Sequence, residues 1–271
     1  MLKTKSAIGA ALAGAFLLGA IVVGYSAAQP KSTAPAHKAG GSFNELQEEE
    51  IGQIIRDYLM ENPEVIIEAV NAYSAEQRLA EVERSKAAAA NNLPRLLDAS
   101  TAYVAGKSPD KAKVAVIEMY DYHCGYCKRA AGLVRELAKD DAEVKVVFRE
   151  LPILREESDY AAEMALAAKE QGKFLDFHFA LLEASGVLTK DRVHSIAEKH
   201  GLNVEKMIAS IEDGAIPNMI ETNYQMAQEL GVDGTPAFII ASLNGDYIDV
   251  VAGFDPNMIQ AKIDEAKQAA S

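Results

Sequence analysis

The sequence predicts an α/β domain built on a strand–helix–strand unit, with a block of helices inserted before a closing β-hairpin. Apolar runs at 114–120 and 144–148 flank a segment with apolar residues at helical spacing, a pattern typical of a βαβ unit. Residues 155–231 show helical periodicity almost throughout. An Asn-Gly turn at 244–245 joins two further apolar runs, and this combination indicates an antiparallel hairpin.

The N-terminus has the pattern of a secretory signal peptide over residues 1–28. Lys3 and Lys5 precede an apolar stretch at 7–23, and small residues follow at 26–28. We expect cleavage there and export to the periplasm. The alternative is an uncleaved anchor that keeps the protein at the membrane, although the stretch is short for a transmembrane helix. In either case the compartment is oxidising and permits a working disulfide.

The composition limits the possible partners. The 271-residue chain has a net charge of −13 and no cluster of basic residues. An acidic chain of this kind is not expected to bind nucleic acid or an anionic lipid surface. It contains only two cysteines, so its core does not depend on disulfide staples, and we expect these cysteines to act chemically.

Residues 29–41 are rich in Pro, Ala and Gly and are expected to form a flexible tether. Residues 42–92 predict a helical stalk. The capping-box spacing at 42–45 opens its first helix, and Asn62-Pro63 opens its second. The second helix becomes polar and Ala-rich after Tyr73, which is typical of a spacer, and a stop is expected at Asn91-Asn92.

Each stalk helix carries an apolar stripe. Because a single helix cannot bury its stripe alone, we expect the stalk to assemble the protein into a dimer or trimer. The alternative is packing on the main domain of the same chain. The stripes are formed by Ile51, Ile54, Ile55, Tyr58 and Leu59 in the first helix, and by Val65, Ile66, Ala69, Val70 and Tyr73 in the second.

The main domain is expected to span residues 93–271. Its βαβ unit should be right-handed with parallel strands, and about four helices should form the insert, one of which holds His178 in the core. The remaining expected elements are a short strand at 101–105, hairpin strands at 237–241 and 247–251, and a last helix from Asp255-Pro256 to about residue 270.

Cys124 and Cys127 form a Cys-x-x-Cys motif where the central strand meets the following helix. Unpaired N–H groups and the helix dipole stabilise an anion at a helix N-terminus, so Cys124 is expected to form a thiolate readily. Cys127 lies one turn further along and should be more buried, within disulfide reach. A thiolate that attacks disulfides and a second thiol that resolves the mixed disulfide form a complete redox pair, which needs no metal or other cofactor.

Two other interpretations of the motif are weaker. A structural zinc site would need four ligands, but the chain has no further cysteine, and His123 is too close in sequence to complete the set. An inert structural disulfide across a two-residue gap would close a very small loop and constrain little of the unfolded chain.

The element order and two motifs resemble the thioredoxin fold, and the size of the insert resembles its DsbA-like branch. The first motif runs from Glu118 through aromatic residues into Cys124-Gly125-Tyr126-Cys127-Lys128, and the second is Gly234-Thr235-Pro236-Ala237-Phe238 before a strand. The resemblance implies that Pro236 is cis and faces the cysteines. Tyr126 stands where the family has a histidine, a departure that bears on the oxidising strength of the pair.

The stalk, over residues 49–73, resembles that of ScsC-type and outer-membrane-antigen-type members of the same branch. This second resemblance implies a dimer or trimer that shuffles disulfides. The first resemblance also implies that Thr235 presents its backbone to an extended substrate segment.

Glu118 interrupts the apolar central strand. It is either a buried carboxyl with a raised pKa that relays protons to Cys127, or an acid on an edge strand or facing solvent. His123 either stabilises the Cys124 thiolate when protonated or is an exposed loop residue.

Three tyrosines around the motif are candidates for the wall of a substrate groove. They are Tyr120, Tyr122 and Tyr126, with a core position as the alternative for Tyr120.

These observations predict a periplasmic thiol-disulfide oxidoreductase that acts on protein substrates and exchanges electrons with a membrane redox partner. We expect an oligomeric disulfide isomerase or a mixed oxidase/isomerase. The alternatives are a monomeric dithiol oxidase of the DsbA type and a non-enzymatic surface or periplasmic binding protein in which the stalk is the functional part.

Overall fold

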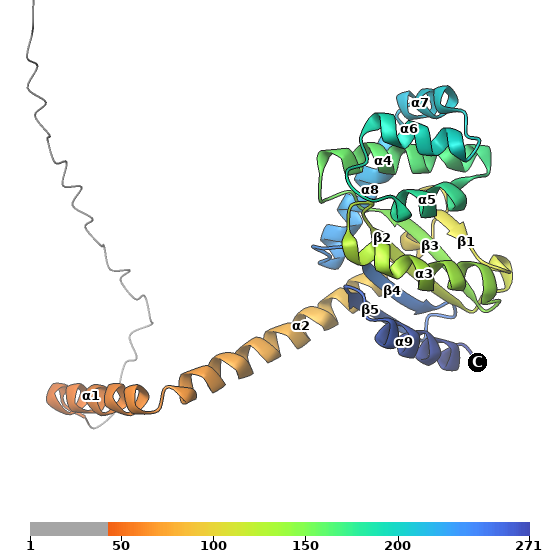
Figure 1. The fold of residues 1–271 in the computed structure, drawn as a ribbon. Coiled ribbons are helices and arrows are strands. Elements are labelled where there is room, and N and C mark those ends of the chain that lie inside the picture. The colour runs from red at the N-terminus through yellow and green to blue at the C-terminus, as the bar shows by residue number, and fades with distance from the viewer. Residues whose placement is uncertain (1–42) are drawn as a thin grey trace, which may run out of the picture. The chain divides into compact units, whose positions relative to one another are not determined.

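The computed structural model describes residues 43–271 (Figure 1). The expected signal peptide, the tether and Ser42 lie outside the described residues. The chain divides into two compact units, residues 1–63 and 64–271. None of the helices in the described part combines the length and hydropathy needed to cross a membrane.

The second unit is built on a five-stranded sheet in the order β1-β3-β2-β4-β5. Strands β2 and β3 are parallel, and the other neighbouring pairs are antiparallel. The βαβ unit and the hairpin are therefore confirmed. The strands are β1 (Tyr103–Ala105), β2 (Val114–Tyr120), β3 (Val144–Glu150), β4 (Ala237–Ser242) and β5 (Ile248–Ala252).

Strand β2 is the centre of the molecule. It pairs with β3 on one side and β4 on the other, and all seven of its residues are buried. Alternate side chains enter two different cores because successive residues of a strand point to opposite faces. Val116 and Tyr120 pack into one core, and Ile117 and Met119 pack into the other.

Helices cover both faces of the sheet (Figure 1). The core that contains Val116 is closed by α3, α9 and the inserted helices, and the core that contains Ile117 is closed by the C-terminal part of the last inserted helix, α8, and by the end of α2 (Glu64–Leu96). The insert holds five α-helices rather than about four. The helices of this unit after α2 are α3 (Gly125–Asp140), α4 (Glu156–Ala167), α5 (Phe174–Glu183), α6 (Lys190–Lys199), α7 (Val204–Glu212), α8 (Ala215–Leu230) and α9 (Pro256–Ala269), with short 3-10 helices at Pro109–Lys111 and Ala168–Gln171.

The first unit contributes helix α1 (Glu45–Glu61). Its capping box is formed by Asn44 and Gln47, two residues later than the sequence pattern indicated. The Asn44 side chain accepts the Gln47 N–H at 3.0 Å, and the Gln47 side chain accepts the Asn44 N–H. Asn62 caps the end of α1 by donating to the Tyr58 carbonyl, so its expected role as N-cap of the second helix is wrong.

Helix α2 (Glu64–Leu96) runs past the expected stop at Asn91-Asn92. The prediction fails there because the last turns pack on the domain, where Ala89 and Leu96 are fully buried. The helix is about 50 Å long at 1.5 Å per residue, and only its C-terminal part is held by the sheet and α8. The Ser85 hydroxyl donates to the Leu230 carbonyl at 2.7 Å, and Lys86 pairs with Asp249 of β5 at 3.3 Å.

A buried arginine of β3 closes the end of α2. The Arg149 side chain is fully buried, and it donates from Nε to the Leu96 carbonyl at 3.0 Å and from Nη2 to the Arg95 carbonyl. It also donates to Oδ1 of Asn223 in α8 at 2.7 Å. A cation at a helix C-terminus satisfies carbonyls that have no partner within the helix. Arg149 therefore links α2 and α8 to β3, the strand that pairs with β2 next to the Cys-x-x-Cys motif.

Candidate active site

Cys124 is the N-cap residue of α3, directly after the loop that leaves β2. Its Sγ accepts the Cys127 N–H at 3.4 Å and lies 3.0 Å from the Thr235 carbonyl oxygen, to which it donates when the thiol is protonated. Both cysteines are free thiols in this structure. The predicted strand–cysteine–helix junction is therefore present, with the first sulfur at the positive end of a helix.

The surroundings of Cys124 lower its pKa from 9.0 to about 5. The largest cause is a hydrogen bond from the Cys127 side chain, and backbone N–H groups of Cys127 and Tyr126 add to it, while burial acts in the opposite direction. Hydrogen bonds to the charged form favour ionisation. Cys124 is therefore a thiolate at neutral pH.

Cys127 is fully buried, and its surroundings raise its pKa. Burial is the main cause, followed by the hydrogen bond to Cys124 and the nearby Glu118 carboxyl. The two sulfurs thus differ strongly in acidity. The first is a ready nucleophile, and the second must lose a proton before it can attack.

Glu118 lies in the middle of β2, between Phe148 and Phe238 of the neighbouring strands. Its side chain is buried, and within the described residues neither carboxyl oxygen has a hydrogen-bond partner. Burial, with a further contribution from the charge of Cys124, raises the pKa of Glu118 to about 8. This geometry is that of a buried carboxyl on a central strand, and not of an edge-strand or solvent-facing acid.

The Thr235–Pro236 peptide bond is cis, as the family resemblance implied. Pro236 stands at the start of β4, and the carbonyl of Thr235 contacts the reactive sulfur. The loop before β4 therefore brings a backbone edge beside Cys124, although the two segments are more than a hundred residues apart in sequence.

His123 is tied into the protein by both ring nitrogens. Nδ1 contacts the Ser158 hydroxyl at 2.8 Å, and Nε2 accepts the Leu188 N–H at 3.0 Å. Burial lowers its pKa, with the charge of Asp121 opposing the shift. The neutral His123 ring offers no positive charge to the Cys124 thiolate in this structure. Its two hydrogen bonds join the active-site loop to the inserted segment.

Asp121 holds the same loop and was not singled out by the sequence. One carboxyl oxygen accepts the His123 N–H at 2.6 Å and the Ser158 hydroxyl at 2.9 Å, and the other accepts the Leu154 N–H at 2.9 Å. The side chain is fully buried. Its position three residues before Cys124 was the available signal, because an acid beside a catalytic motif often accepts backbone N–H groups of the loop.

Tyr120 and Tyr122 are buried, so Tyr122 is a core residue and not part of a groove wall. Both hydroxyls donate to one oxygen of the buried Glu150, at 2.5 and 2.9 Å, and Tyr122 also contacts Nδ1 of His178 at 2.9 Å. Burial raises the pKa of Glu150 and lowers that of His178 to about 3. The prediction that His178 lies in the core is confirmed.

Tyr126 is the one member of the three tyrosines that faces solvent, with 56% of its surface exposed. The guanidinium of Arg129 lies 3.9 Å from the centre of its ring. In the part of the chain from residue 43 onward, no three His, Cys, Asp or Glu side chains are grouped so that they could hold a metal ion.

A thioredoxin-type sheet, a thiolate at a helix N-terminus, a buried second thiol and a cis-proline loop beside them define a thiol-disulfide exchange protein. Comparison with protein families makes the assignment specific. Residues 115–264 match the DSBA-like thioredoxin domain, and the chain belongs to this family of thiol-disulfide oxidoreductases. Residues 47–80 match the N-terminal domain of the copper resistance protein ScsC.

Solved structures agree with this assignment. The thiol-disulfide exchange protein alpha-DsbA2 from Wolbachia pipientis is 30% identical, with a TM-score of 0.60 over 69% of this chain and 97% of its own. A thioredoxin-like oxidoreductase from Silicibacter pomeroyi is 38% identical, with a TM-score of 0.56 over 62% of this chain and 93% of its own. BcfH from Salmonella enterica Typhimurium is 28% identical, with a TM-score of 0.69 over 81% of this chain and 96% of its own.

Among curated proteins, the Na(+)/H(+) antiporter NhaA 3 of Salinispora tropica is 33% identical over 136 residues, which are 49% of this chain and 21% of the antiporter. The match thus spans about a fifth of that relative's own length.

Proposed function

We propose that the protein is an oligomeric disulfide isomerase, or a mixed oxidase/isomerase, that assists the folding of secreted proteins in the periplasm. The observation that carries the proposal is the exposed apolar surface of α1 and the first half of α2, attached to a domain with a reactive thiol pair. The expected signal peptide at 1–28 supports the compartment.

The proposed reaction begins when the Cys124 thiolate attacks a substrate disulfide. A bond forms between Cys124 and one substrate sulfur, and the other substrate sulfur leaves as a thiolate. In isomerisation, a second substrate thiolate attacks the mixed disulfide and releases Cys124. In reduction, Cys127 loses its proton, attacks the Cys124 sulfur and releases the substrate thiol, which leaves a Cys124–Cys127 disulfide. Oxidation is the same sequence in reverse.

Three neighbouring groups are proposed to assist this reaction. Glu118, a buried carboxyl that raises the pKa of Cys127, accepts the Cys127 proton in its ionised form and later returns it. The backbone of Thr235, whose carbonyl contacts the Cys124 sulfur, pairs with an extended substrate segment. Exposed Tyr126 offers an apolar contact beside the reactive sulfur.

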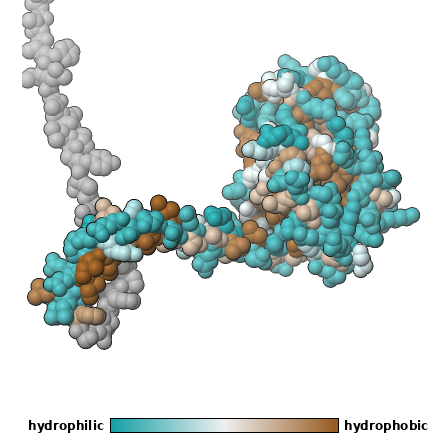
Figure 2. Space-filling model, turned by 60° about the horizontal axis from the view of Figure 1, so that its bottom comes forward, coloured by the Kyte–Doolittle hydropathy of each residue, from teal (hydrophilic) through white to brown (hydrophobic). Residues whose placement is uncertain are grey.

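The stalk supplies the oligomer in this proposal. Burying one apolar side chain fully contributes ~1.5–3 kcal/mol, so about ten such residues per chain exceed an association cost of ~4–15 kcal/mol. Figure 2 shows brown, hydrophobic side chains along both stalk helices. The exposed apolar residues are Phe43, Leu46, Ile51, Ile54, Ile55, Tyr58 and Met60 in and before α1, and Ile66, Ile67, Val70, Tyr73, Leu79 and Val82 in α2.

A dimer or trimer would surround a misfolded protein with several Cys124 thiolates at a raised effective concentration. It would also hinder docking into a membrane oxidase that accepts monomers, so the thiols would be kept reduced by a different membrane redox partner. Both consequences favour isomerisation over net oxidation.

The test compares single substitutions of two exposed apolar residues in the mature chain, residues 29–271. Ile54→Glu places a charge in the proposed stalk interface, and Met258→Glu places one on α9, where 48% of the methionine is exposed. Mass is measured by light scattering at micromolar concentration. Isomerase activity is measured with scrambled ribonuclease and reductase activity with insulin.

We expect the unsubstituted chain and Met258→Glu to be dimeric or trimeric and to refold scrambled ribonuclease. Ile54→Glu should be monomeric, lose that activity and still reduce insulin. A mature chain that is already a monomer would support a DsbA-type dithiol oxidase instead. A chain inactive in both assays would indicate a binding protein without thiol chemistry.

A further inference from the structure

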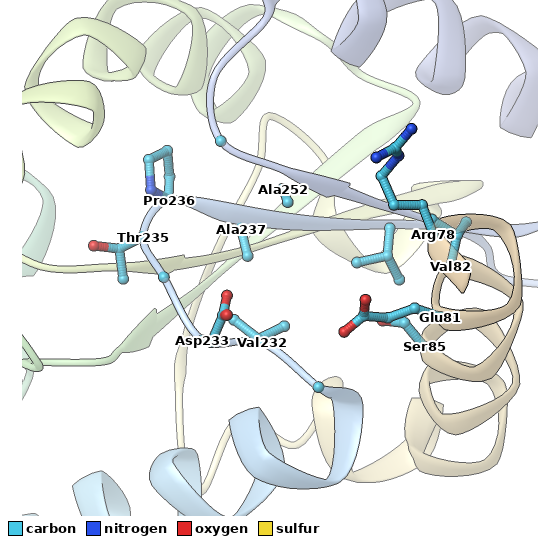
Figure 3. A pocket seen from close by; sticks show the side chains of 14 residues that line it. Arg78, Glu81, Val82, Ser85, Val232, Asp233, Thr235, Pro236, Ala237 and Ala252 are labelled. Atoms are coloured by element: carbon cyan, nitrogen blue, oxygen red, sulfur yellow. The ribbon is translucent and has the colours of Figure 1, made fainter. Parts of the chain in front are cut away.

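A cavity of about 420 Å³ lies between the stalk helix α2 and the loop that carries the cis-proline (Figure 3). Its walls come from three parts of the second unit. Residues 78–85 of α2 form one wall, residues 231–237 form the second, and residues 250–253 at the end of β5 form the third. A volume of this size falls within the ~300–1,000 Å³ range of ligand-binding pockets.

The cavity is adjacent to the reactive sulfur. Thr235 and Pro236 line it, and the carbonyl of Thr235 is 3.0 Å from Sγ of Cys124. A substrate chain joined to Cys124 and paired with this loop rises ~3.3 Å per residue, and every second side chain points to the same face. The side chain two positions from the substrate cysteine is therefore about 7 Å away and can enter the cavity.

The walls combine apolar surface with free carboxyl groups. Glu81 and Asp233 point into the space between α2 and the loop, while the guanidinium of Arg78 points away from them (Figure 3). Across residues 43–271, neither carboxyl takes part in an ion pair. The apolar lining is formed by Val82, Val232, Ala237, Val250 and Ala252.

We propose that this cavity binds an arginine or lysine side chain of the substrate protein, two residues from the cysteine that reacts with Cys124. The aliphatic stem of such a side chain would lie on the apolar lining, and its charged end would meet Glu81 and Asp233. The inference rests on the proposed exchange reaction with protein substrates and adds a sequence preference to it.

One carboxyl of this site comes from the stalk and the other from the catalytic domain. Helix α2 is fixed against the domain at this level by the bond from Ser85 to Leu230 and by the Lys86–Asp249 pair. The stalk helix is thus a part of the substrate site in addition to its role in assembly, and its register on β5 decides where Glu81 stands.

The experiment uses the full mature chain with Cys127→Ala, so that reaction stops at the mixed disulfide. The substrates are short blocked peptides whose single cysteine is joined to 2-thiopyridone, with Arg, norleucine or Glu two positions before or after the cysteine. Attack by Cys124 forms the peptide disulfide and releases thiopyridone, whose absorbance is followed by stopped flow. A small uncharged pyridyl disulfide is the reference for thiol reactivity.

In one of the two positions, the Arg peptide should react about tenfold faster than the Glu peptide at low salt, because the exposed carboxylates attract the Arg side chain and repel the Glu side chain. Glu81→Gln with Asp233→Asn should reduce this ratio to about two. The matched control is Glu212→Gln with Asp213→Asn, which removes the same charge from exposed positions at the C-terminal end of α7, far from α2 (Figure 1), and should keep the ratio.

Three results would overturn the inference: equal rates for the Arg and Glu peptides, an equally fast norleucine peptide, or an equal loss of the ratio in the α7 control. Failure of the proposed function itself would look different, because the unsubstituted mature chain, with both cysteines present, would then fail to reduce insulin.

Discussion

Replacing Glu118 by glutamine should raise the free energy of unfolding of the reduced protein, and the size of this increase should depend on pH. The carboxyl is buried without a hydrogen-bond partner among residues 43–271, and its pKa is raised from 4.5 to about 8. A raised carboxyl pKa means that the folded state binds the proton more tightly than the unfolded state. The folded state is therefore penalised as pH rises above 4.5, and the penalty stops growing above pH 8. Glutamine has nearly the same shape and no such penalty.

The size of the effect follows from the pKa values. One pKa unit corresponds to about 1.4 kcal/mol. At pH 7 the unfolded-state carboxyl is ionised and the folded-state carboxyl is still mostly protonated, so the penalty is ~3 kcal/mol. Near pH 4 both states are protonated and the penalty approaches zero. For a domain of about 200 residues, ~3 kcal/mol raises Tm by roughly 6–12 °C.

Urea unfolding of the reduced protein at pH 4, 7 and 8 measures this difference, with Glu205→Gln on the exposed surface of α7 as control. We expect Glu118→Gln to gain ~3 kcal/mol at pH 7, more at pH 8 and almost nothing at pH 4. The gain should shrink in the oxidised protein, because the Cys124 thiolate that helps to raise the pKa is then absent. A gain that is equal at pH 4 and pH 8 would refute the reasoning.

Three further predictions concern the same region. Titration of Cys124, followed by thiolate absorbance or alkylation rate, should have its midpoint near pH 5. Cys127→Ala should move this midpoint upward towards the free-thiol value of about 8.5, since the Cys127 side chain is the largest cause of the lowered pKa. An unchanged midpoint would contradict this. Glu118→Gln should slow resolution of a mixed disulfide at Cys124 and leave the initial attack nearly unchanged; equal slowing of both steps would reject the relay. Arg149→Met should cost ~3–5 kcal/mol, because buried carbonyls lose a charged donor. Arg95→Met, which breaks an exposed pair with Glu229 and an exposed hydrogen bond to Asn92, should cost under ~1 kcal/mol. Similar losses in the last two variants, measured by urea unfolding, would show that Arg149 is not the anchor of α2.

The fold could be predicted from the sequence because its main signals are local. Strand β2, the helix after the cysteines and the 237–251 hairpin each produce their own periodicity or turn pattern within about fifteen residues. The position of Cys124 at a helix N-terminus follows from the same local order. Each of these patterns depends only on residues that are close together in the sequence, so it can be recognised without knowing which distant segments are in contact.

The end of α2 could not be predicted from local sequence, because it depends on a distant residue. Polar residues at 91–92 are a reasonable local stop, but α2 continues to Leu96 because Arg149, more than fifty residues later, supplies the hydrogen bonds that its last carbonyls need. Whether His123 is exposed and whether Tyr122 lines a groove could not be judged locally either, since the partners that hold both side chains come from the inserted segment.

The sequence by itself determined the reactive pair, Cys124 and Cys127, the α/β order around it and the apolar stripes of the stalk. Only the tertiary structure decided that Glu118 is on a central strand, that Asp121 holds the active-site loop, and that Glu81 and Asp233 line one cavity beside the cis-proline. The physical reason is the sequence distance over which the interactions act. Helix and strand periodicity and helix capping act between neighbours along the chain, whereas burial, and with it the pKa of every buried group, depends on segments that meet only after the chain has folded.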